Sequence, residues 1–593
     1  MSRQKIRIGG ASGFWGEASY ATAQLLSDPD LDVLVYDYLA EITLSIMARA
    51  RAKDPTSGYA PDFISDAMKP NLQKIASRGI KVLSNAGGMN PLACADALKS
   101  EIAAQGLSLS VAVVEGDDLR GCLDQVAKNP EMFSGKPYPD LNSVLSVNAY
   151  LGAGPVVAAL HAGADIVLTG RCVDSALALA ACMHAFDWPF DDYDRLAAGS
   201  LAGHLLECGP QAMGGNFTDW EDVPDRARIS YPIAQVRADG SCVISAAPDA
   251  DALVIPLSVG EQMLYEIGDP QAYDLPDVSC DFSNVSLRAL TDKQVEVSGA
   301  TGRAPTGQLK VSTTSKDGFR AGQVVNFNGR DARAKGTVFV QSALDRARDK
   351  LSTWNAPDYQ AVSVEMFGGR PCDGPYEEIA VTAAVQHQDA RAVDLFLKEL
   401  IGAALAAPPG LHFFTGAGRP KPSPVVALFS SLVPADLPTV SVTLEGKPLP
   451  YSSAAPKEAP QLPVPHPDPE CPITGHSVSC RLEDVAVARS GDKGDIANIG
   501  VIARAPEFMP WIWAALTPDA VGTHFAGRVD GAITRFFLPG THSMNIVMQN
   551  ALGGGGIASL RNDSQGKGYA QCLLAMPVLL PADIAPKTHR KRL

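Results

Sequence analysis

Short apolar, β-branched runs alternate with helical stretches through the first 220 residues, and this alternation most constrains the fold. The strand-like runs lie at residues 5–9, 31–36, 80–83, 107–114 and 166–169, with helical patterns between them. Such alternation is typical of βαβ units, whose right-handed crossovers build a mostly parallel sheet that is buried on both faces. We therefore predict an α/β fold with a doubly wound, Rossmann-like core over residues 1–220.

The rest of the chain divides at a proline-rich stretch. Shorter alternating segments separated by Gly, Pro and Asp predict an α+β extension over residues 221–447, so the core as a whole covers residues 1–447. Prolines then recur over residues 448–472, which favours an extended linker. Residues 473–585 carry enough strand and helix signals for a small α+β domain, and residues 586–593 form a basic tail.

Composition excludes several classes of protein. The 593 residues are 46% hydrophobic and 19% charged, as in globular proteins, and no run of about 18 apolar residues predicts a membrane span. The N-terminus lacks the pattern of a secretory signal, so we expect a cytoplasmic protein. Eleven scattered cysteines without a CxxC pair argue against disulfides and structural zinc, and a net charge of −15 argues against nucleic acid or anionic membranes. We expect a closed homo-oligomer, the common state of large cytoplasmic proteins.

The first glycine loop, Gly-Gly-Ala-Ser-Gly-Phe-Trp-Gly at residues 9–16, joins a strand to a helical stretch. This arrangement aims backbone N–H groups at an anion, although the loop does not match GxGxxG. Asp37 follows the next strand, where a ribose-binding acid lies in dinucleotide sites. A tight turn that needs glycine for packing is the alternative. The candidate ligand-binding residues are Gly10, Ser12, Gly13 and Gly16.

A second loop, Ser-Asn-Ala-Gly-Gly-Met-Asn-Pro at residues 84–91, also follows a strand. Ligands bind outside the carboxyl ends of parallel strands, so both loops are expected to face one crevice. A glycine turn with asparagine caps is the alternative. The candidate binding residues are Asn85, Gly87, Gly88 and Asn90.

A third group combines Asn148, in Asn-Ala-Tyr-Leu-Gly-Ala, with Arg171 and Asp174, which follow the strand at residues 166–169. The guanidinium of Arg171 can hold a carboxylate or phosphate in a bidentate manner. An ion pair between Arg171 and Asp174 that caps the next helix is the structural alternative.

A fourth group is His204, Glu207 and Cys208, in Gly-His-Leu-Leu-Glu-Cys-Gly. On a helix, His204 reaches either neighbour because they lie three and four residues away. Histidine can activate the thiol as a nucleophile or transfer protons with Glu207. A metal site is less favoured, since no second histidine cluster is visible, and we predict no bound metal.

A fifth group lies beyond the linker, in Ala-Arg-Ser-Gly-Asp-Lys-Gly-Asp-Ile-Ala-Asn at residues 488–498. Arg489 and Lys493 can contact an anion with Asp492 orienting them, and a solvated hairpin is the alternative.

Together, these motifs resemble the acyclic terpene utilisation AtuA family. The resemblance implies a large core domain followed, after residue 472, by a ferredoxin-like C-terminal domain. It also implies a role in the breakdown of citronellol- and geraniol-type terpenes as coenzyme A thioesters. The implied reaction is lyase cleavage of a branched 3-hydroxyglutaryl-CoA into acetate and a shorter acyl-CoA, with coenzyme A as part of the substrate and no bound prosthetic group.

For such a cleavage, His204 or Glu207 is the candidate base, and Arg171 with the two glycine loops would hold the carboxylate and thioester oxygens. Cys208 would donate a proton or form an acyl-enzyme. A hydratase, isomerase or CoA-transfer activity on a carboxylic acid is the first alternative. A non-catalytic subunit of an acyl-CoA complex is the second.

Overall fold

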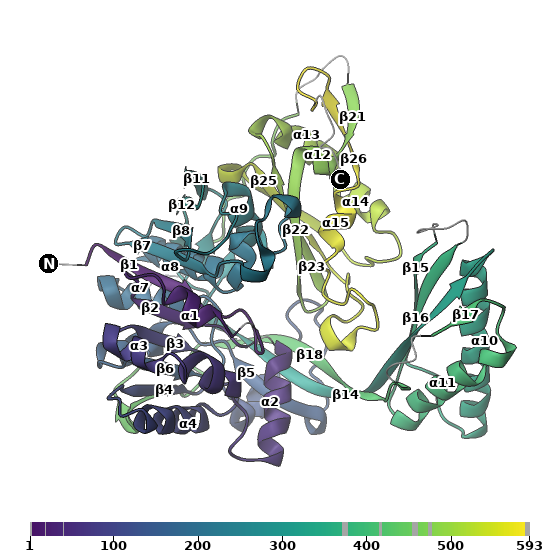
Figure 1. Cartoon of the computed structure of the whole chain (residues 1–593), viewed down its shortest axis with the longest axis horizontal. Helices are drawn as coiled ribbons and strands as arrows, with labels where there is room; N and C mark the ends of the chain where they lie inside the picture. Colours follow the sequence, from purple (N-terminus) through teal and green to yellow (C-terminus); the bar gives the residue numbers. More distant parts are fainter. Residues whose placement is uncertain are drawn as a thin grey trace.

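The computed structural model describes residues 3–17, 19–39, 41–369, 377–413, 418–452, 460–471 and 477–586 (Figure 1). Its largest element is an 11-stranded sheet, in which five central strands run parallel in the order β1-β2-β3-β6-β4. These strands are β1 (Lys5–Gly10), β2 (Val33–Tyr36), β3 (Lys81–Ser84), β6 (Ile166–Thr169) and β4 (Val111–Glu115).

Antiparallel pairing extends this sheet at both edges. The strands beside β1 are β7 (Pro232–Arg237), β8 (Cys242–Ala246), β12 (Gln294–Ser298) and β11 (Ser286–Thr291). The strands beside β4 are β19 (Ser441–Leu444) and β20 (Lys447–Leu449). One sheet therefore includes segments from both predicted halves of the core, and it takes in the first residues of the predicted linker.

Helices cover both faces of the parallel strands, because successive strand residues point to opposite sides. Leu34 packs into one buried cluster and its neighbour Val35 into the other. The helices on the Leu34 side are α1 (Ala21–Leu25), α2 (Glu41–Lys53), α3 (Leu72–Arg78) and α4 (Pro91–Ala104). Those on the Val35 side include α6 (Gly154–His161), α7 (Ala176–Phe186), α8 (Tyr193–Leu206) and α9 (Pro256–Leu264).

The predicted mixed α/β fold is confirmed, but a Rossmann-like core is not. The Rossmann order is 3-2-1-4-5-6, with a reversal at the first strand. Here β1, β2 and β3 follow one another in one direction, and β6 lies between β3 and β4. The alternation of strands and helices along the sequence does not determine the order of the strands in the sheet, because that order depends on which strands pair in space.

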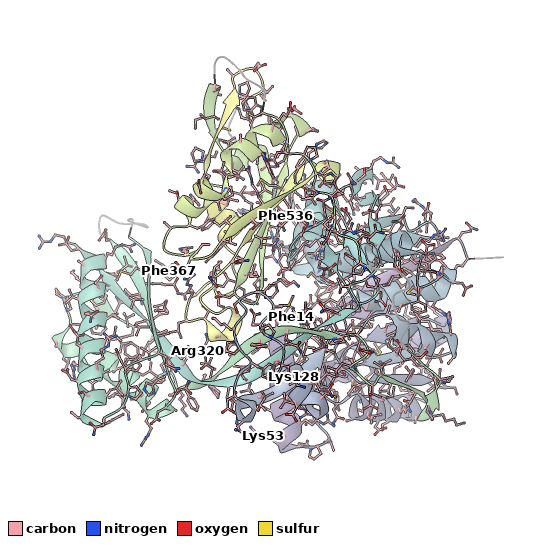
Figure 2. All side chains as sticks on the ribbon, turned by 180° about the vertical axis from the view of Figure 1, so that it is seen from behind. Phe14, Lys53, Lys128, Arg320, Phe367 and Phe536 are labelled. Atoms are coloured by element: carbon pink, nitrogen blue, oxygen red, sulfur yellow. The ribbon has the colours of Figure 1, made fainter. Side chains whose placement is uncertain are left out.

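A long strand, β14 (Gln308–Asn328), connects the core to a side lobe (Figure 1). Near the core it pairs with β5 (Val144–Ala149) and β18 (Ser423–Pro434). The side lobe consists of the far end of β14 with β15 (Ala361–Gly368), β16 (Glu378–His387), β17 (Leu411–His412), α10 (Ala332–Thr353) and α11 (Ala390–Gly402). Phe327, Phe339 and Phe396 are buried between its strands and helices. Arg320 of β14 donates a hydrogen bond to the carbonyl of Ser559, so the strand also touches the C-terminal domain (Figure 2).

The C-terminal domain is built on a four-stranded antiparallel sheet in the order β22-β23-β25-β24. Its strands are β22 (Ala486–Lys493), β23 (Ile496–Ala503), β24 (Ile533–Leu538) and β25 (Ser543–Met548), with β21 (Ser477–Arg481) paired to β26 (Pro577–Pro581). Its helices are α12 (Leu482–Val485), α13 (Met509–Ala515), α14 (Pro518–His524) and α15 (Tyr569–Leu573).

The C-terminal domain is anchored to the core by buried polar contacts. The two terminal guanidinium nitrogens of Arg504 donate to Asp219, at 2.6 and 2.7 Å, and the amide of Asn498 donates to the carbonyl of Leu264. The described part of the linker also touches the core, where His466 bonds Ser283 at 2.8 Å. Residues 587–593 of the predicted basic tail lie outside the described residues. None of the helices in the described ranges has the length and hydropathy needed to cross a bilayer.

Candidate functional site

The carboxyl ends of β2, β3 and β6 bring polar side chains together at one edge of the sheet, as parallel strands do. Asn85, after β3, donates through its amide to Asp37, after β2, and accepts from the N–H of Tyr38 at 2.7 Å. Arg171, after β6, donates to the carbonyl of Leu39. The three strand ends are thus tied to one another by side-chain hydrogen bonds.

Arg171 is buried, with only 2% of its surface exposed, and its charge is balanced locally. Its guanidinium lies 2.9 Å from Asp174 and stacks over the ring of Tyr150 at 4.0 Å. Its backbone N–H donates to Asp117 at 2.8 Å. The ion pair with Asp174, which was the structural alternative for these two residues, is therefore present, and the charge of Asp174 acts on Asp37 and Glu207.

His204 and Glu207 form a buried pair at the end of α8. His204 Nδ1 lies 2.9 Å from Glu207 Oε1, and His204 Nε2 lies 3.2 Å from the carbonyl oxygen of Met263. A carbonyl only accepts, so Nε2 carries a proton, and a second proton lies between Nδ1 and the carboxyl group. The pair is either an imidazolium with a carboxylate or a neutral imidazole with a carboxylic acid.

Burial and neighbouring charges set the proton affinity of this pair. Burial alone would lower the pKa of His204, but the charge of Glu207 and their hydrogen bond raise it above its usual value. Burial also raises the pKa of Glu207, and the charge of Asp174 adds to this effect while His204 opposes it. Both groups therefore hold protons more tightly than they would in water.

Asp37 belongs to the same electrostatic cluster. Burial raises the pKa of Asp37 well above its usual value, and the charges of Asp174 and Glu207 raise it further, against Arg171 and the Asn85 hydrogen bond. Raised pKa values of buried carboxyl groups such as Asp37 and Glu207 are a perturbation that is common at acid–base sites.

Of the three predicted binding residues in the C-terminal domain, Lys493 acts on this cluster through its charge. Its charge lowers the pKa of both His204 and Glu207, and its ammonium lies 3.8 Å from Glu266. Asp492 is bonded to Lys567 at 3.0 Å.

Arg489 has a different role. It donates to Gln211 at 2.5 Å and to the carbonyls of Gly215 and Asn216 at 3.3 and 3.2 Å, and it stacks over Tyr265. These contacts join the C-terminal domain to the core, so Arg489 is placed to hold the interface rather than a ligand.

The first glycine loop packs against the end of α8, which supports the packing alternative. The N–H groups of Gly13 and Gly16 donate to Glu17 at 2.5 Å and Asp62 at 3.1 Å, so the chain's own carboxylates occupy two donors that an anion would need. A Cβ on Gly13 would lie 2.9 Å from the carbonyl oxygen of Glu207, and one on Gly10 would lie 2.6 Å from that of Leu206.

Ser12 also has a positioning role, because its hydroxyl donates to the carbonyl of Asp37 at 3.0 Å. The helix after the loop, α1, is only five residues long and has little dipole to offer an anion. The predicted anion site at this loop is therefore not supported, and the glycines let the loop approach the residues that carry the acid–base pair.

The predicted binding residues of the second glycine loop also make contacts with the protein's own backbone. Asn90 donates to the carbonyls of Pro55 and Ser57, both at 2.9 Å. Gly87 and Gly88 allow close packing, since a Cβ on Gly87 would lie 2.5 Å from the carbonyl oxygen of Thr169 and Gly88 has a φ of 53°.

Asn148 supports Arg171 through an intermediate carboxyl group. Its amide donates to Asp117 at 2.8 Å, and Asp117 accepts from the backbone of Arg171. Burial raises the pKa of Asp117 to about 6. Sequence reasoning missed Asp117, because only the fold places it beside β6.

Cys208 is poorly suited to nucleophilic catalysis in this structure. Burial, followed by the charges of Glu207 and Glu266, raises the pKa of its thiol well above the usual value. The thiolate is the reactive form of cysteine. The acyl-enzyme role proposed from the sequence is therefore not supported, although a protonated thiol can still donate.

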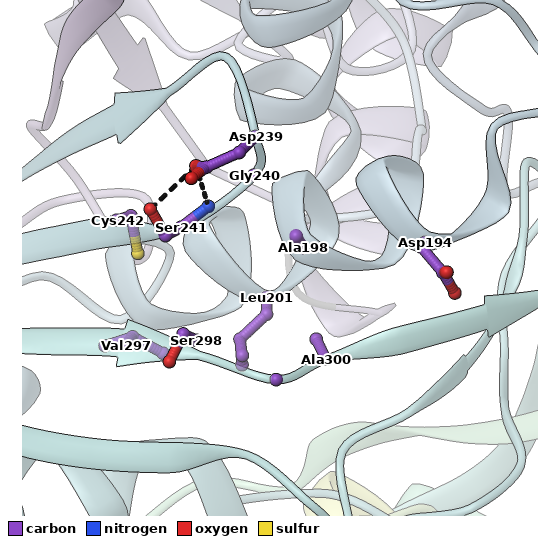
Figure 3. Close-up of a pocket in the computed structure, with 11 residues that line it drawn as sticks. Asp194, Ala198, Leu201, Asp239, Gly240, Ser241, Cys242, Val297, Ser298 and Ala300 are labelled. Carbon is purple, nitrogen blue, oxygen red and sulfur yellow. Dashed lines mark hydrogen bonds between the residues drawn. The ribbon is translucent and has the colours of Figure 1, made fainter.

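A separate surface pocket of about 230 Å³ lies between α8 and the β7–β8 turn (Figure 3). Its Asp239 accepts from the backbone and hydroxyl of Ser241, at 3.0 and 2.7 Å, within its own turn. Asp194 accepts from the backbone of Gly302 at 2.9 Å. Both carboxylates accept hydrogen bonds from nearby backbone. The residues that line this pocket therefore form no acid–base arrangement comparable to the His204–Glu207 pair.

Sequence analysis noted Asp37 only as a possible ribose-binding acid, because it directly follows a buried strand, and it did not identify Glu266, which no local pattern marks. Within the described ranges, no group of three or more His, Cys, Asp or Glu side chains is arranged to hold a metal ion.

Comparison with known proteins identifies two matching family models. The model described as acyclic terpene utilisation family protein AtuA matches residues 6–444, and the model described as AtuA ferredoxin-like domain matches residues 480–579. No curated protein and no solved structure matches the chain.

Proposed function

We propose, from the premise that this chain belongs to the acyclic terpene utilisation AtuA family, that it is a carbon–carbon lyase acting on a branched 3-hydroxyglutaryl-CoA-type thioester. Family membership by itself suggests a role in acyclic terpene utilisation. The reaction and the substrate are the further step, and they rest on the chemistry available at the site.

One observation carries the proposal: His204 and Glu207 form a buried hydrogen-bonded pair whose pKa values respond to the charge of Lys493, and Arg171 belongs to the same cluster because Arg171 and Glu207 both act on Asp37. A retro-aldol cleavage needs a base for the tertiary hydroxyl and positive charge for the anion that leaves. The pair supplies the first requirement, and the two cations supply the second.

In the proposed reaction, the pair takes the proton of the 3-hydroxyl group and the C–O bond becomes a carbonyl. The bond from C3 to the carboxymethyl group breaks, and its electron pair moves to the departing carbon as an enediolate. A proton returned from the site gives acetate, and the other product is a 3-oxoacyl-CoA. No oxidant or reductant is required, because the electrons stay within the two products.

The cations have distinct roles in this scheme. Arg171 is held by Asp174 and Tyr150, so its position is fixed before the substrate binds. Lys493 comes from the C-terminal domain, which would make the domain part of the active site. Preorganised charge of this kind stabilises the transition state without rearrangement during the reaction.

The test is an assay of the full chain with branched 3-hydroxyglutaryl-CoA esters, with products followed by mass spectrometry. The proposal expects acetate and a 3-oxoacyl-CoA in equal amounts. Solvent deuterium entering the substrate without fragmentation would instead identify a hydratase or isomerase, which the buried carboxyl groups also suit. Absence of both fragmentation and exchange would overturn the proposed enzyme activity on these esters.

A further inference from the structure

Two lysines of the C-terminal domain approach one carboxylate of the core. Lys567 Nζ lies 2.9 Å from Glu266 Oε1, and Lys493 Nζ lies 3.8 Å from Glu266 Oε2. Lys567 also donates to Asp492 at 3.0 Å and to the hydroxyl of Tyr265. Lys567 is therefore the closer partner of Glu266, whereas Lys493 lies beyond hydrogen-bond distance of it.

The position of Glu266 is fixed by its backbone and by the strands that flank Lys493. Glu266 follows α9 with a φ of 56°, a left-handed conformation that is uncommon for residues other than glycine. Its N–H donates to the side-chain oxygen of Asn498, on β23, at 3.0 Å. A Cβ on Gly491, on β22, would lie 2.5 Å from Glu266 Cγ, so the close approach of this strand requires glycine.

Lys567 is held in place through the loop that carries it. Its N–H donates to Asp563 at 2.8 Å, and the carbonyl of the preceding Gly566 accepts from the hydroxyl of Ser490 at 2.6 Å. Ser490 also accepts from the N–H of Ala570 at 3.0 Å. These bonds tie the loop before α15 to β22, so the two lysines reach Glu266 from segments that are bonded to each other.

The charges of this network indicate what each lysine contributes. Burial would raise the pKa of Glu266, but the charge of Lys567, followed by that of Lys493, lowers it below its usual value. Glu266 is therefore ionised at neutral pH, and Lys567 is its stronger counterion. The two ammonium groups balance the carboxylates of Glu266 and Asp492. Without Lys567, both carboxylates would attract Lys493 alone.

We propose that Lys567 is a positioning residue for Lys493: by binding the two carboxylates, it prevents them from drawing the Lys493 ammonium into a close ion pair. The consequence extends to the acid–base pair, because the charge of Lys493 acts on His204 and Glu207. An ammonium in a close pair with a carboxylate would act on them less. This inference rests on the proposed function for its effect on catalysis, but the state of Lys493 can be measured without turnover.

The test is acetylation of the full chain with an N-hydroxysuccinimide ester of acetate, with the rate at Lys493 read by peptide mass spectrometry. The side chain of Lys493 is 33% exposed, so the reagent can reach it. Only the neutral amine reacts, and a close carboxylate favours the charged form, so Lys567→Met should slow acetylation of Lys493 by about threefold or more. Glu266→Gln should accelerate it by a similar factor. Lys567→Arg keeps the charge and should give the wild-type rate.

Lys398→Met is the matched control, because it removes an exposed ion pair with Asp394 on α11 of the side lobe and should leave the rate at Lys493 unchanged. A merely structural network would instead loosen in both Lys567→Met and Glu266→Gln. Faster acetylation of Lys493 in both variants would therefore overturn the proposal, and so would unchanged rates.

Turnover supplies the second readout. Lys567→Met should lower kcat about tenfold, and Lys567→Arg should restore it, because the charge of Lys493 is part of the preorganised site. Opposite changes in acetylation in a chain that cleaves no thioester would support the role of Lys567 and end the proposed lyase activity.

Discussion

His204 and Glu207 lie on consecutive turns at the end of α8, with Nδ1 and Oε1 2.9 Å apart, and they share a proton that water reaches poorly. The carbonyl of Met263 accepts from Nε2 and so assigns the tautomer of the ring. In the proposed reaction, the proton between the two side chains is the one available for chemistry.

Glu207→Gln should abolish most activity while leaving the fold intact. The amide can still donate to Nδ1, but it cannot take up a proton, so kcat should fall by about 10²–10⁴. Glu507→Gln, an exposed change in the C-terminal domain, is the matched control and should retain full activity. Unchanged turnover in Glu207→Gln would favour a non-catalytic role for this pair.

Gly13→Ala should reduce activity by displacing the backbone of Glu207, since the added Cβ would lie 2.9 Å from its carbonyl oxygen and 3.1 Å from the Cα of Cys208. A displacement of about 1 Å near the reacting groups can cost about 100-fold in rate. Gly121→Ala, where a Cβ meets nothing within 4 Å, is the control. Steady-state kinetics of both variants would check this, and equal kcat values would refute the positioning role of the loop.

Glu261→Gln should stabilise the protein at high pH. Burial raises the pKa of Glu261 to about 8, and one of its oxygens has no hydrogen-bond partner among the described residues. The folded protein holds this proton more tightly than the unfolded chain, so wild-type stability falls as pH rises from about 4.5 to 8.

Glutamine keeps the hydrogen bond from Thr218, which is 2.5 Å long in the wild type, without the cost of ionisation. At pH 9 the free energy of unfolding of Glu261→Gln should therefore exceed that of the wild type by about 3–5 kcal/mol, with a higher Tm. Near pH 4 the two proteins should have the same Tm. Thermal unfolding at both pH values tests this. A difference of the same size at both would exclude ionisation as its cause.

Arg504→Ala should loosen the C-terminal domain from the core. It removes a bidentate bond to Asp219, whose side chain is only 9% exposed, and leaves that carboxylate without this counterion. Breaking a buried pair in this way costs about 3–5 kcal/mol. Activity should fall with stability, because Lys493 belongs to the same domain.

Limited proteolysis within residues 460–471, together with kcat, would measure this loosening. Arg481→Ala, which removes an exposed pair with Glu483, is the control and should be cleaved at the wild-type rate. Faster cleavage without loss of activity would separate the C-terminal domain from catalysis.

Local chemistry was enough to predict the pairs that lie close in sequence. His204 and Glu207 lie three positions apart, as do Arg171 and Asp174, and both contacts that this spacing allows occur in the structure. The strand–glycine–helix units were also visible, because each depends on side-chain periodicity and backbone freedom within a few residues. The matched family models confirm the resemblance that these motifs indicated.

The sequence by itself therefore determined the mixed α/β elements, the family and the contact between His204 and Glu207. Only the tertiary structure decided the strand order, the side lobe, and the electrostatic effect of Lys493 on His204 across two domains. It also decided that the first glycine loop serves packing, since the same residues before a helix are compatible with an anion until Glu17 and Asp62 occupy their N–H groups. The physical reason is that strand pairing, burial and charge coupling depend on neighbours in space, which a local pattern does not specify.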